Sequence, residues 1–284
     1  MKVVSVSAVV RAATLAVATL GAAFGAGAIG AAAPLPRPAH VVIVIDENKA
    51  FGQVIDNAHA PYLNGVAKRG TIFTDAHGIT HPSLPNYLAL FAGLTNTNGD
   101  GCPAVGFSRN APNLASELLA AHLTFGAYSE SLPQAGFTGC SAGELYARKH
   151  APWVEFANVP QAFHRPFAAL PSYDRLPTVT FIVPNLTNDM HDAPVPVGDA
   201  WARTVLAPLF RWADAHDTLV IVTWDEGYDD ANSTPTFFYG PMVRAGRSAE
   251  RIDHYRVLRT VEDMYGLTPS GHAAQARPIA NVWR

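Results

Sequence analysis

Three apolar runs constrain the fold of this chain more than any other feature of its sequence. They are "HVVIVID" at residues 40–46, "TVTFIV" at residues 178–183 and "TLVIVTW" at residues 218–224. Each run is rich in β-branched residues and lacks regular alternation with polar side chains. Continuous runs of this kind are typical of strands that are buried on both faces of a parallel sheet.

Segments with a helical pattern alternate with these strands. We expect helices in residues 60–70, 113–122, 199–217 and 254–267, and shorter strands in residues 125–130 and 234–240. Gly70 follows the first helical pattern as a stop, and Pro208 should kink the third. Strands that alternate with helices predict an α/β fold, here a three-layer sandwich with a mostly parallel central sheet.

The first 33 residues read as a signal peptide that precedes one domain of residues 34–284. They carry Lys2 and Arg11, an apolar middle and an alanine-rich exit. A transmembrane anchor is the alternative, but the Gly- and Ala-rich run and its cleavable exit favour a signal peptide. No later segment approaches the length of a spanning helix, so we expect a bacterial protein that is secreted or periplasmic, without a transmembrane anchor.

The net charge limits the kinds of partner that the protein can bind, and the cysteines indicate the redox compartment in which it works. Without Lys2 and Arg11, 18 basic residues face 23 acidic ones, a net charge of −5. Such a balance argues against nucleic acid as a partner, because binding phosphate backbones needs a basic surface. The two cysteines, Cys102 and Cys140, lie in loop-like stretches, and export favours a disulfide between them.

Polar residues follow each of the three long strands. The first strand leads into Asp46, Glu47 and Asn48, the second into residues 188–192, and the third into Asp225 and Glu226. Ligands bind beyond the carboxyl ends of strands in such sheets, and carboxylates gathered there would repel one another. A bound cation relieves this repulsion. Oxygen ligands favour Mg²⁺, Ca²⁺ or Mn²⁺, while a histidine in the second segment admits a transition metal.

The stretch "THPSLPNYLALFAG", residues 80–93, places a serine between two prolines at the start of a helix. Ser83 suits the role of helix N-cap there. It also suits that of a nucleophile, because a helix N-terminus attracts phosphate and stabilises an alkoxide. Each polar segment taken singly has an ordinary structural explanation, whereas three strand ends and one helix start taken together favour a catalytic site.

Five segments resemble a known family in the same order along the chain. They are "HVVIVIDENKAFGQVI", "THPSLPNYLALFAG", "VPNLTNDMHD", "VTWDE" and "HYRVLRTVEDMYGL". They resemble the bacterial phosphoesterase family of secreted acid phosphatases and phospholipases C, within the alkaline-phosphatase-like superfamily. The resemblance runs from about residue 39 to the C-terminus and implies an alkaline-phosphatase-like fold.

The resemblance implies metal-assisted phosphoryl transfer through a phosphoserine. Ser83 matches the family's nucleophile, three residues before Asn86, whose amide would donate to a phosphoryl oxygen; Thr80 is the competing nucleophile. The implied metal ligands are Glu47, Asn48, Ser83, Asp225 and Glu226. Two-metal relatives carry Asp-His where this chain has Asp225-Glu226, which favours one divalent hard cation, with zinc as a further candidate.

Four further residues are candidates for substrate binding. Asp189 and His191 stand where two-metal relatives place ligands, and we expect His191 to contact phosphate or to protonate the leaving alcohol. His150 resembles a family position that reaches the phosphate, although it could equally end a helix. His254 resembles a position close to the site, with a buried structural role as its alternative.

The function expected from these features is that of a secreted, metal-dependent acid phosphatase that acts on phosphate monoesters. A phospholipase C or a phosphoinositide phosphatase, acting on lipid phosphoesters, is the alternative among enzymes. An exported phosphate-binding protein without turnover is the alternative from another class, although this chain retains the expected nucleophile and metal ligands.

Overall fold

The long strands lie side by side in one eight-stranded sheet with the order β11-β2-β10-β9-β1-β8-β4-β7. In this computed structural model the strands are β1 His40–Asp46, β2 Thr71–Phe73, β4 Phe125–Ser129, β7 His164–Pro166, β8 Val179–Val183, β9 Thr218–Trp224, β10 Thr236–Tyr239 and β11 Gly246–Ser248. Every neighbouring pair is parallel except those of β10, which runs antiparallel to both β9 and β2. Two small sheets pair β3 Ala76–His77 with β12 Ile252–Asp253, and β5 Ser141–Ala142 with β6 Tyr146–Ala147.

Strand β1 is buried on both faces, as its sequence predicts. Val41, Ile43 and Ile45 point into the hydrophobic core on one face of the sheet, and Val42 and Val44 point into the core on the other. All five residues are at most 1% exposed. This double burial explains why the run contains no alternation with polar residues.

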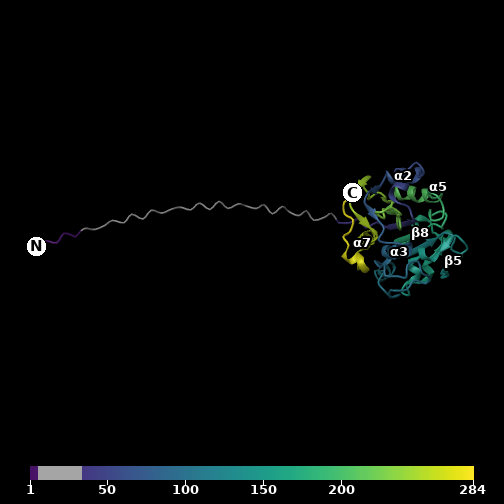
Figure 1. The fold of residues 1–284 in the computed structure, drawn as a ribbon, viewed down its shortest axis with the longest axis horizontal. Helices are drawn as coiled ribbons and strands as arrows, with labels where there is room; N and C mark the ends of the chain where they lie inside the picture. The colour runs from purple at the N-terminus through teal and green to yellow at the C-terminus, as the bar shows by residue number, and fades with distance from the viewer. Residues whose placement is uncertain (6–33) are drawn as a thin grey trace. The chain divides into compact units, whose positions relative to one another are not determined.

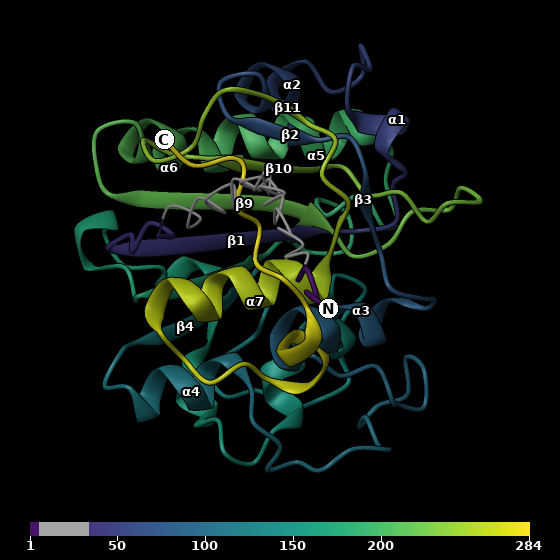
Figure 2. The same ribbon diagram turned by 90° about the vertical axis from the view of Figure 1, so that its left-hand side faces the viewer.

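Helices cover both faces of the sheet, which confirms the predicted three-layer α/β fold (Figures 1 and 2). Figure 2 shows α3, α4 and α7 on one side of the strands and α2, α5 and α6 on the other. The helices are α1 Phe51–Val54, α2 Pro61–Ala67, α3 Ser83–Ala92, α4 Leu114–Ala120, α5 Val195–Trp201, α6 Ala207–Ala213 and α7 His254–Tyr265. Single-turn 3-10 helices lie at Arg148–His150, Pro152–Glu155, Gln161–Phe163, Phe167–Ala169 and Tyr173–Arg175, and a slightly longer one at Gly271–Gln275.

The long helix expected in residues 199–217 begins earlier and is interrupted. It starts with α5, widens into a π-helical stretch at Ala202–Leu206 and continues as α6. Pro208 lacks the N–H for the regular helical bond and its ring crowds the preceding turn, so the wider turn lies where a kink was predicted.

The structure describes residues 1–5 and 34–284. Most of the predicted signal peptide, residues 6–33, therefore lies outside the described residues. From residue 34 onward the described chain forms one compact unit. Among the described residues, no helix is both long and apolar enough to cross a membrane. The strands at the two edges of the sheet, β7 and β11, have three residues each.

Candidate active site

The three strand ends meet at one edge of the sheet, as their sequences predict. Because β1 lies between β8 and β9, the segments that follow these strands become neighbours. The Glu47 N–H donates to the Asp189 carbonyl at 2.8 Å, and the Asn48 N–H donates to Asp225 Oδ1 at 3.1 Å. Backbone hydrogen bonds thus hold Glu47, Asn48, Asp189 and Asp225 around a common centre.

Ser83 brings its hydroxyl to this centre from the first turn of α3. Pro82 is the N-cap residue, and Ser83 is the first residue of the helix. The buried Ser83 Oγ donates to Glu47 Oε2 at 3.0 Å instead of capping its own helix. The structure therefore does not support the N-cap interpretation, and it joins Ser83 to the predicted carboxylate cluster.

Burial makes the carboxylates of this cluster hard to ionise. Burial, followed by repulsion from Asp225 and Asp189, raises the pKa of Glu47 well above its usual value. Burial, followed by repulsion from Glu226, raises the pKa of Asp225 in the same way. Burial also raises the pKa of Asp189, to about 7. A nearby positive charge would favour the ionised form of all three groups.

Several oxygens of the cluster fit a hard cation because they are buried without hydrogen-bond partners. They are Glu47 Oε1, Asn48 Oδ1 and Asp225 Oδ2. In the described part of the chain, no group of three or more His, Cys, Asp or Glu side chains is arranged to hold a metal ion. The donors at this centre are instead two carboxylates with an amide and the Ser83 hydroxyl, a set of oxygens that suits Mg²⁺, Ca²⁺ or Mn²⁺.

Glu226, the remaining predicted metal ligand, has side-chain partners of its own. Its Oε2 accepts a hydrogen bond from His81 Nδ1 at 2.5 Å, and its Oε1 accepts one from the Tyr228 hydroxyl at 3.2 Å. The His81 ring also stacks on Tyr228. Both carboxylate oxygens are therefore engaged by side chains, and the structure gives Glu226 a role in holding the turn before Ser83.

Asn86 also has different partners from those expected. Its Oδ1 accepts the N–H groups of Ile79 and Thr80, at 2.8 and 3.1 Å. Its Nδ2 donates to the carbonyls of Thr80 and Pro82, at 2.8 and 3.3 Å. The amide shapes the turn that carries the serine, and its contact with a phosphoryl oxygen stays a prediction.

His150 lies inside the cluster, in agreement with its candidate role. Its Nε2 is 3.1 Å from Glu47 Oε1, and its Nδ1 is 3.5 Å from Asp189 Oδ2. The ring stacks on Tyr87 of α3, with 5.0 Å between the ring centroids. Burial, and then the cation of Lys149, lowers the pKa of His150 well below its usual value.

His191 lies at the more exposed margin of the site. Its backbone N–H donates to Asp189 Oδ1 at 2.8 Å, which fixes the backbone after β8 next to the carboxylate cluster. Its Nδ1 is 2.7 Å from Asp192 Oδ1, and its Nε2 is 3.4 Å from Lys149 Nζ. The imidazole is 29% exposed, so it can reach a molecule that enters from solvent.

His254 has the structural role that the sequence left open. It is 1% exposed, and its Nε2 lies 2.6 Å from the Asp225 carbonyl oxygen. This contact fixes the backbone at the end of β9. His254 therefore positions Asp225, and its role in binding substrate stays a prediction.

The disulfide between Cys102 and Cys140 is formed, with 2.09 Å between the sulfur atoms. It joins two loops that carry further polar residues to the site. Asp100 accepts the Leu84 N–H through Oδ1 at 2.9 Å and Lys149 Nζ through Oδ2 at 3.0 Å. Sequence reasoning missed this pair, because only the folded loops bring Asp100 to the N-terminus of α3.

A buried ion pair supports the same loops. Arg148 donates to both carboxylate oxygens of Glu155, at 2.7 and 2.8 Å, and to the Thr138 carbonyl at 2.6 Å. Glu155 also accepts the Ala104 N–H at 3.2 Å. This network fixes the segment that carries Lys149 and His150.

A hollow of about 410 Å³ adjoins the cluster. Lys49, which follows Asn48, lines it and donates from Nζ to the Met190 carbonyl at 2.5 Å. Its other walls include His59 and residues 194–196. The hollow combines a cation next to the carboxylates with apolar walls, which suits the organic part of a substrate.

Comparison with known proteins agrees with this site and fold. The model of the phosphoesterase family matches residues 53–268. A phosphatidylinositol-3-phosphatase of Mycobacterium tuberculosis is 48% identical over 260 residues, which cover 89% of this chain and 85% of that protein. A phosphate-repressible acid phosphatase of Penicillium chrysogenum is 31% identical over 74% of this chain and 55% of its own length. The chain thus spans about half the length of that fungal relative.

Solved structures agree on the fold. A protein of the alkaline phosphatase superfamily from Vibrio parahaemolyticus has a TM-score of 0.60 and 11% identity, covering 88% of this chain and 72% of that chain. Together, the fold, the site and the relatives define a phosphoric ester hydrolase with an alkaline-phosphatase-like fold. Within that class, the chain belongs to the phosphoesterase family.

Proposed function

We propose that this protein is an exported, metal-dependent phosphomonoesterase that works through a phosphoserine at Ser83. The observation that carries the proposal is the hydrogen bond from Ser83 Oγ to Glu47 Oε2, inside a buried cluster with unpartnered oxygens. A serine with an ordinary structural role would be expected to cap its helix. The formed disulfide supports export to an oxidising compartment.

The cation would be held by Glu47, Asn48, Asp225 and Ser83 Oγ, and would supply positive charge to the phosphoryl oxygens and to the serine oxygen. Glu47 Oε2 orients the serine hydroxyl by accepting its hydrogen. Ser83 Oγ then attacks phosphorus while its proton passes to Glu47 Oε2, and the ester P–O bond breaks. His191, which is held by Asp192 and close to solvent, protonates the leaving alcohol. Water then attacks the phosphoserine and gives a proton to His191, the Ser83 oxygen regains its proton from Glu47, and inorganic phosphate leaves.

The identity of the alcohol separates two candidate substrates. Small phosphate monoesters follow from the acid phosphatase relatives. A phosphoinositide monoester follows from the relative at 48% identity, which covers most of both chains. The hollow lined by Lys49 could take the organic part of either substrate, because it has both a cation and apolar walls.

Turnover of a nitrophenyl phosphate monoester, of a phosphoinositide monoester and of a choline phosphodiester, each with and without a chelator, tests the proposal. We expect the monoesters to be hydrolysed, the chelator to abolish turnover and a divalent ion to restore it. Ser83→Ala should lose several powers of ten in rate with phosphate affinity largely intact. Thr80→Ala is the matched control and should remain active. Turnover of the diester alone, or a phosphoenzyme labelled at Thr80, would overturn the proposal.

A further inference from the structure

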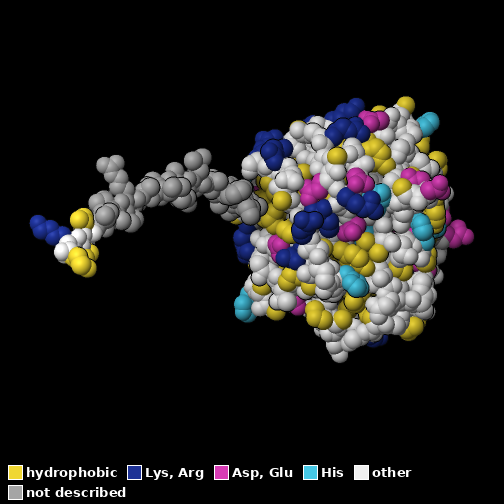
Figure 3. Space-filling view, turned by 60° about the vertical axis from the view of Figure 1, so that its left-hand side comes forward, with side chains coloured by type: hydrophobic (Ala, Val, Ile, Leu, Met, Phe, Trp, Pro, Cys, Tyr) yellow, Lys and Arg dark blue, Asp and Glu magenta, His cyan; other side chains and the backbone are white. Residues whose placement is uncertain are grey.

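Positive charge is concentrated in the last part of the chain. Residues 241–284 contain seven arginines and four acidic residues, a net charge of +3, whereas residues 34–240 carry a net charge of −8. In Figure 2 this segment crosses the face of the molecule that is turned toward the viewer, from β11 through α7 to the C-terminus. Figure 3 shows the molecule from a similar direction, with Lys and Arg side chains on this face and acidic side chains between them.

Four exposed arginines of this segment lie at two hollows of the surface, and we call them the C-terminal arginine face. Arg251 and Arg277 line a hollow of about 700 Å³. Arg244 and Arg247 line a second one of about 370 Å³. All four side chains belong to exposed residues. Arg247 also pairs with Asp56 at 3.0 Å, and Arg244 donates to the Asn281 carbonyl at 2.7 Å. The face therefore carries exposed arginines at several separate points and not in one continuous channel, and those of the larger hollow have the fewest partners.

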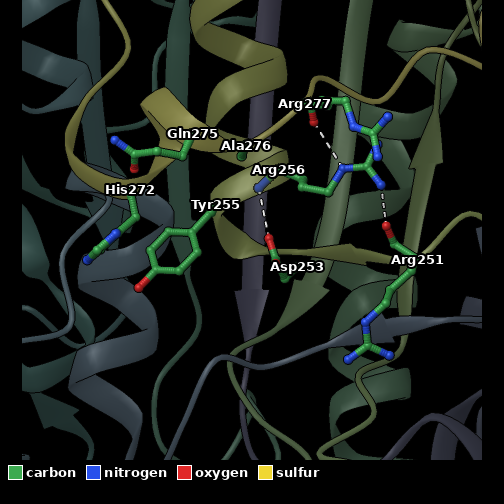
Figure 4. Close-up of a pocket in the computed structure, with 8 residues that line it drawn as sticks. All are labelled: Arg251, Asp253, Tyr255, Arg256, His272, Gln275, Ala276 and Arg277. Carbon is green, nitrogen blue, oxygen red and sulfur yellow. Dashed lines mark hydrogen bonds between the residues drawn. The ribbon is translucent and has the colours of Figure 1, made fainter.

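The larger hollow has two chemically different sides. Figure 4 shows Tyr255, His272 and Gln275 on one side and Arg251 and Arg277 on the other. The rings of Tyr255 and His272 lie 5.3 Å apart. Arg251 is 70% exposed, and its Nη1 lies 3.4 Å from Asp75 Oδ1 and 3.0 Å from His77 Nε2. Among the described residues, no carboxylate lies within ion-pair distance of Arg277.

A third arginine holds the arginine side of this hollow in place. Arg256 donates from its guanidinium to the backbone carbonyls of Arg251 and Arg277, the latter at 2.9 Å (Figure 4). It also donates to Glu250 and to the Pro278 carbonyl. Because Arg256 donates to the backbone carbonyls of Arg251 and Arg277, the backbone positions of both residues are set before any ligand binds. Arg251 Nη1 contacts Asp75 and His77, and its other guanidinium nitrogens remain exposed.

We propose that the C-terminal arginine face binds the surface of an anionic phospholipid bilayer. One guanidinium group can donate to two oxygens of the same phosphate. A bilayer presents many phosphates over a wide area, so arginines that lie apart can each bind one. The amphipathic Tyr255 suits the boundary between headgroups and water. The negative charge of the rest of the chain would repel a longer polyanion that extended beyond this face. This inference concerns membrane attachment and goes beyond the proposed hydrolysis.

Cosedimentation of the purified protein with lipid vesicles tests the inference. Vesicles of neutral phosphatidylcholine are compared with vesicles that contain one third phosphatidylglycerol. We expect binding to the anionic vesicles that falls as salt is raised, and little binding to the neutral ones. Each arginine near an anionic surface contributes about a fivefold change in partitioning, so Arg251→Glu combined with Arg277→Glu should lower binding by at least tenfold.

The control is a variant with the same change in net charge elsewhere, Arg203→Glu combined with Arg211→Glu, both at exposed residues. It should bind the anionic vesicles nearly as well as the unmodified protein. Both variants should hydrolyse a soluble monoester at the unmodified rate, which reports folding independently of attachment. Equal loss of binding in the two variants, intact binding in the first, or equal binding to neutral vesicles would overturn the inference. A monoester that no form of the protein hydrolyses would count against the proposed function alone.

Discussion

Glu47 shows how much a single buried group can cost the fold. It is completely buried, one of its oxygens has no hydrogen-bond partner, and burial raises its pKa well above the usual value. A buried carboxylate whose two oxygens are not both hydrogen-bonded is destabilising, so a chain selected only for stability would place an apolar or amide side chain there. Residues that violate the rules of burial in this way mark the site in a folded structure more sharply than any motif does.

Glu262 of α7 provides a test of pH dependence away from the site. Its Oε1 accepts the Ser270 N–H at 2.8 Å, its Oε2 is buried without a partner, and burial raises its pKa to about 7. The folded state therefore holds a proton that the unfolded chain releases near pH 4.3. The stability that this proton contributes is complete below that pH and is lost as pH rises through 7.

We expect Glu262→Gln to become more stable than the unmodified protein as pH rises. The neutral amide cannot ionise, so the difference in unfolding free energy should grow by about 2–3 kcal/mol between pH 5 and pH 8. Urea unfolding of both proteins at the two pH values measures it. A difference that stays constant with pH would show that Glu262 is ionised in the folded protein throughout this range.

At the level of single residues, the sequence predicts identities better than partners. The approach of Glu47, Asn48 and Asp225 follows from two neighbouring strand ends, of β1 and β9, at one edge of a parallel sheet. The pairing of Glu226 with His81 depends on the shape of the turn before Ser83, which no periodicity encodes. For the same reason, the bonds that Asn86 makes to that turn could not be foreseen.

Among the elements, the two loops joined by Cys102 and Cys140 have little regular structure and are held at several points. The disulfide, the Arg148–Glu155 pair and the contact of Lys149 with Asp100 all fasten them to the rest of the domain. The disulfide could be predicted from the sequence, but the two ion pairs could not, because only the folded loops bring their partners together. The interruption before α6 could be predicted in part. Pro208 indicates that the helix is interrupted, but it does not indicate that the interruption is a π-helical turn.

Removal of the disulfide should weaken both stability and substrate binding. Replacing Cys102 and Cys140 by alanine releases a loop of 38 residues, which is worth roughly 3–4 kcal/mol in the chain-entropy model. Because Asp100 and Lys149 lie next to the joined loops, we expect KM for a monoester to rise more than kcat falls. Urea unfolding and steady-state kinetics measure the two effects. An unchanged midpoint of unfolding would mean that other contacts hold the loops alone.

At the scale of the whole molecule, ion binding should stabilise the fold. A ligand that binds only the folded state at about 100 times its Kd adds about 2.7 kcal/mol. For a domain of this size we therefore expect a divalent ion to raise Tm by roughly 5–10 °C over the chelated protein. Thermal unfolding with Mg²⁺, Ca²⁺ and Mn²⁺ in turn also ranks the ions.

Asp225→Ala is the matched variant for this measurement. It should fold, lose turnover and show no rise in Tm when the same ions are added, because the common centre has lost one of its two closest carboxylates. A full rise in Tm in this variant would place the ion elsewhere in the molecule.

The two edge strands of the sheet determine whether the sheets of two copies of this protein can pair with each other. A second chain that tried to extend the sheet would find only three residues at either end of it, in β7 and β11. Pro166 in β7 has no N–H to offer such a chain, and Arg247 places a charge in the middle of β11. A ladder that cannot be continued gives no template for aggregation. The long apolar strands at the centre therefore cannot pair with the same strands of other molecules, which limits aggregation at high protein concentration.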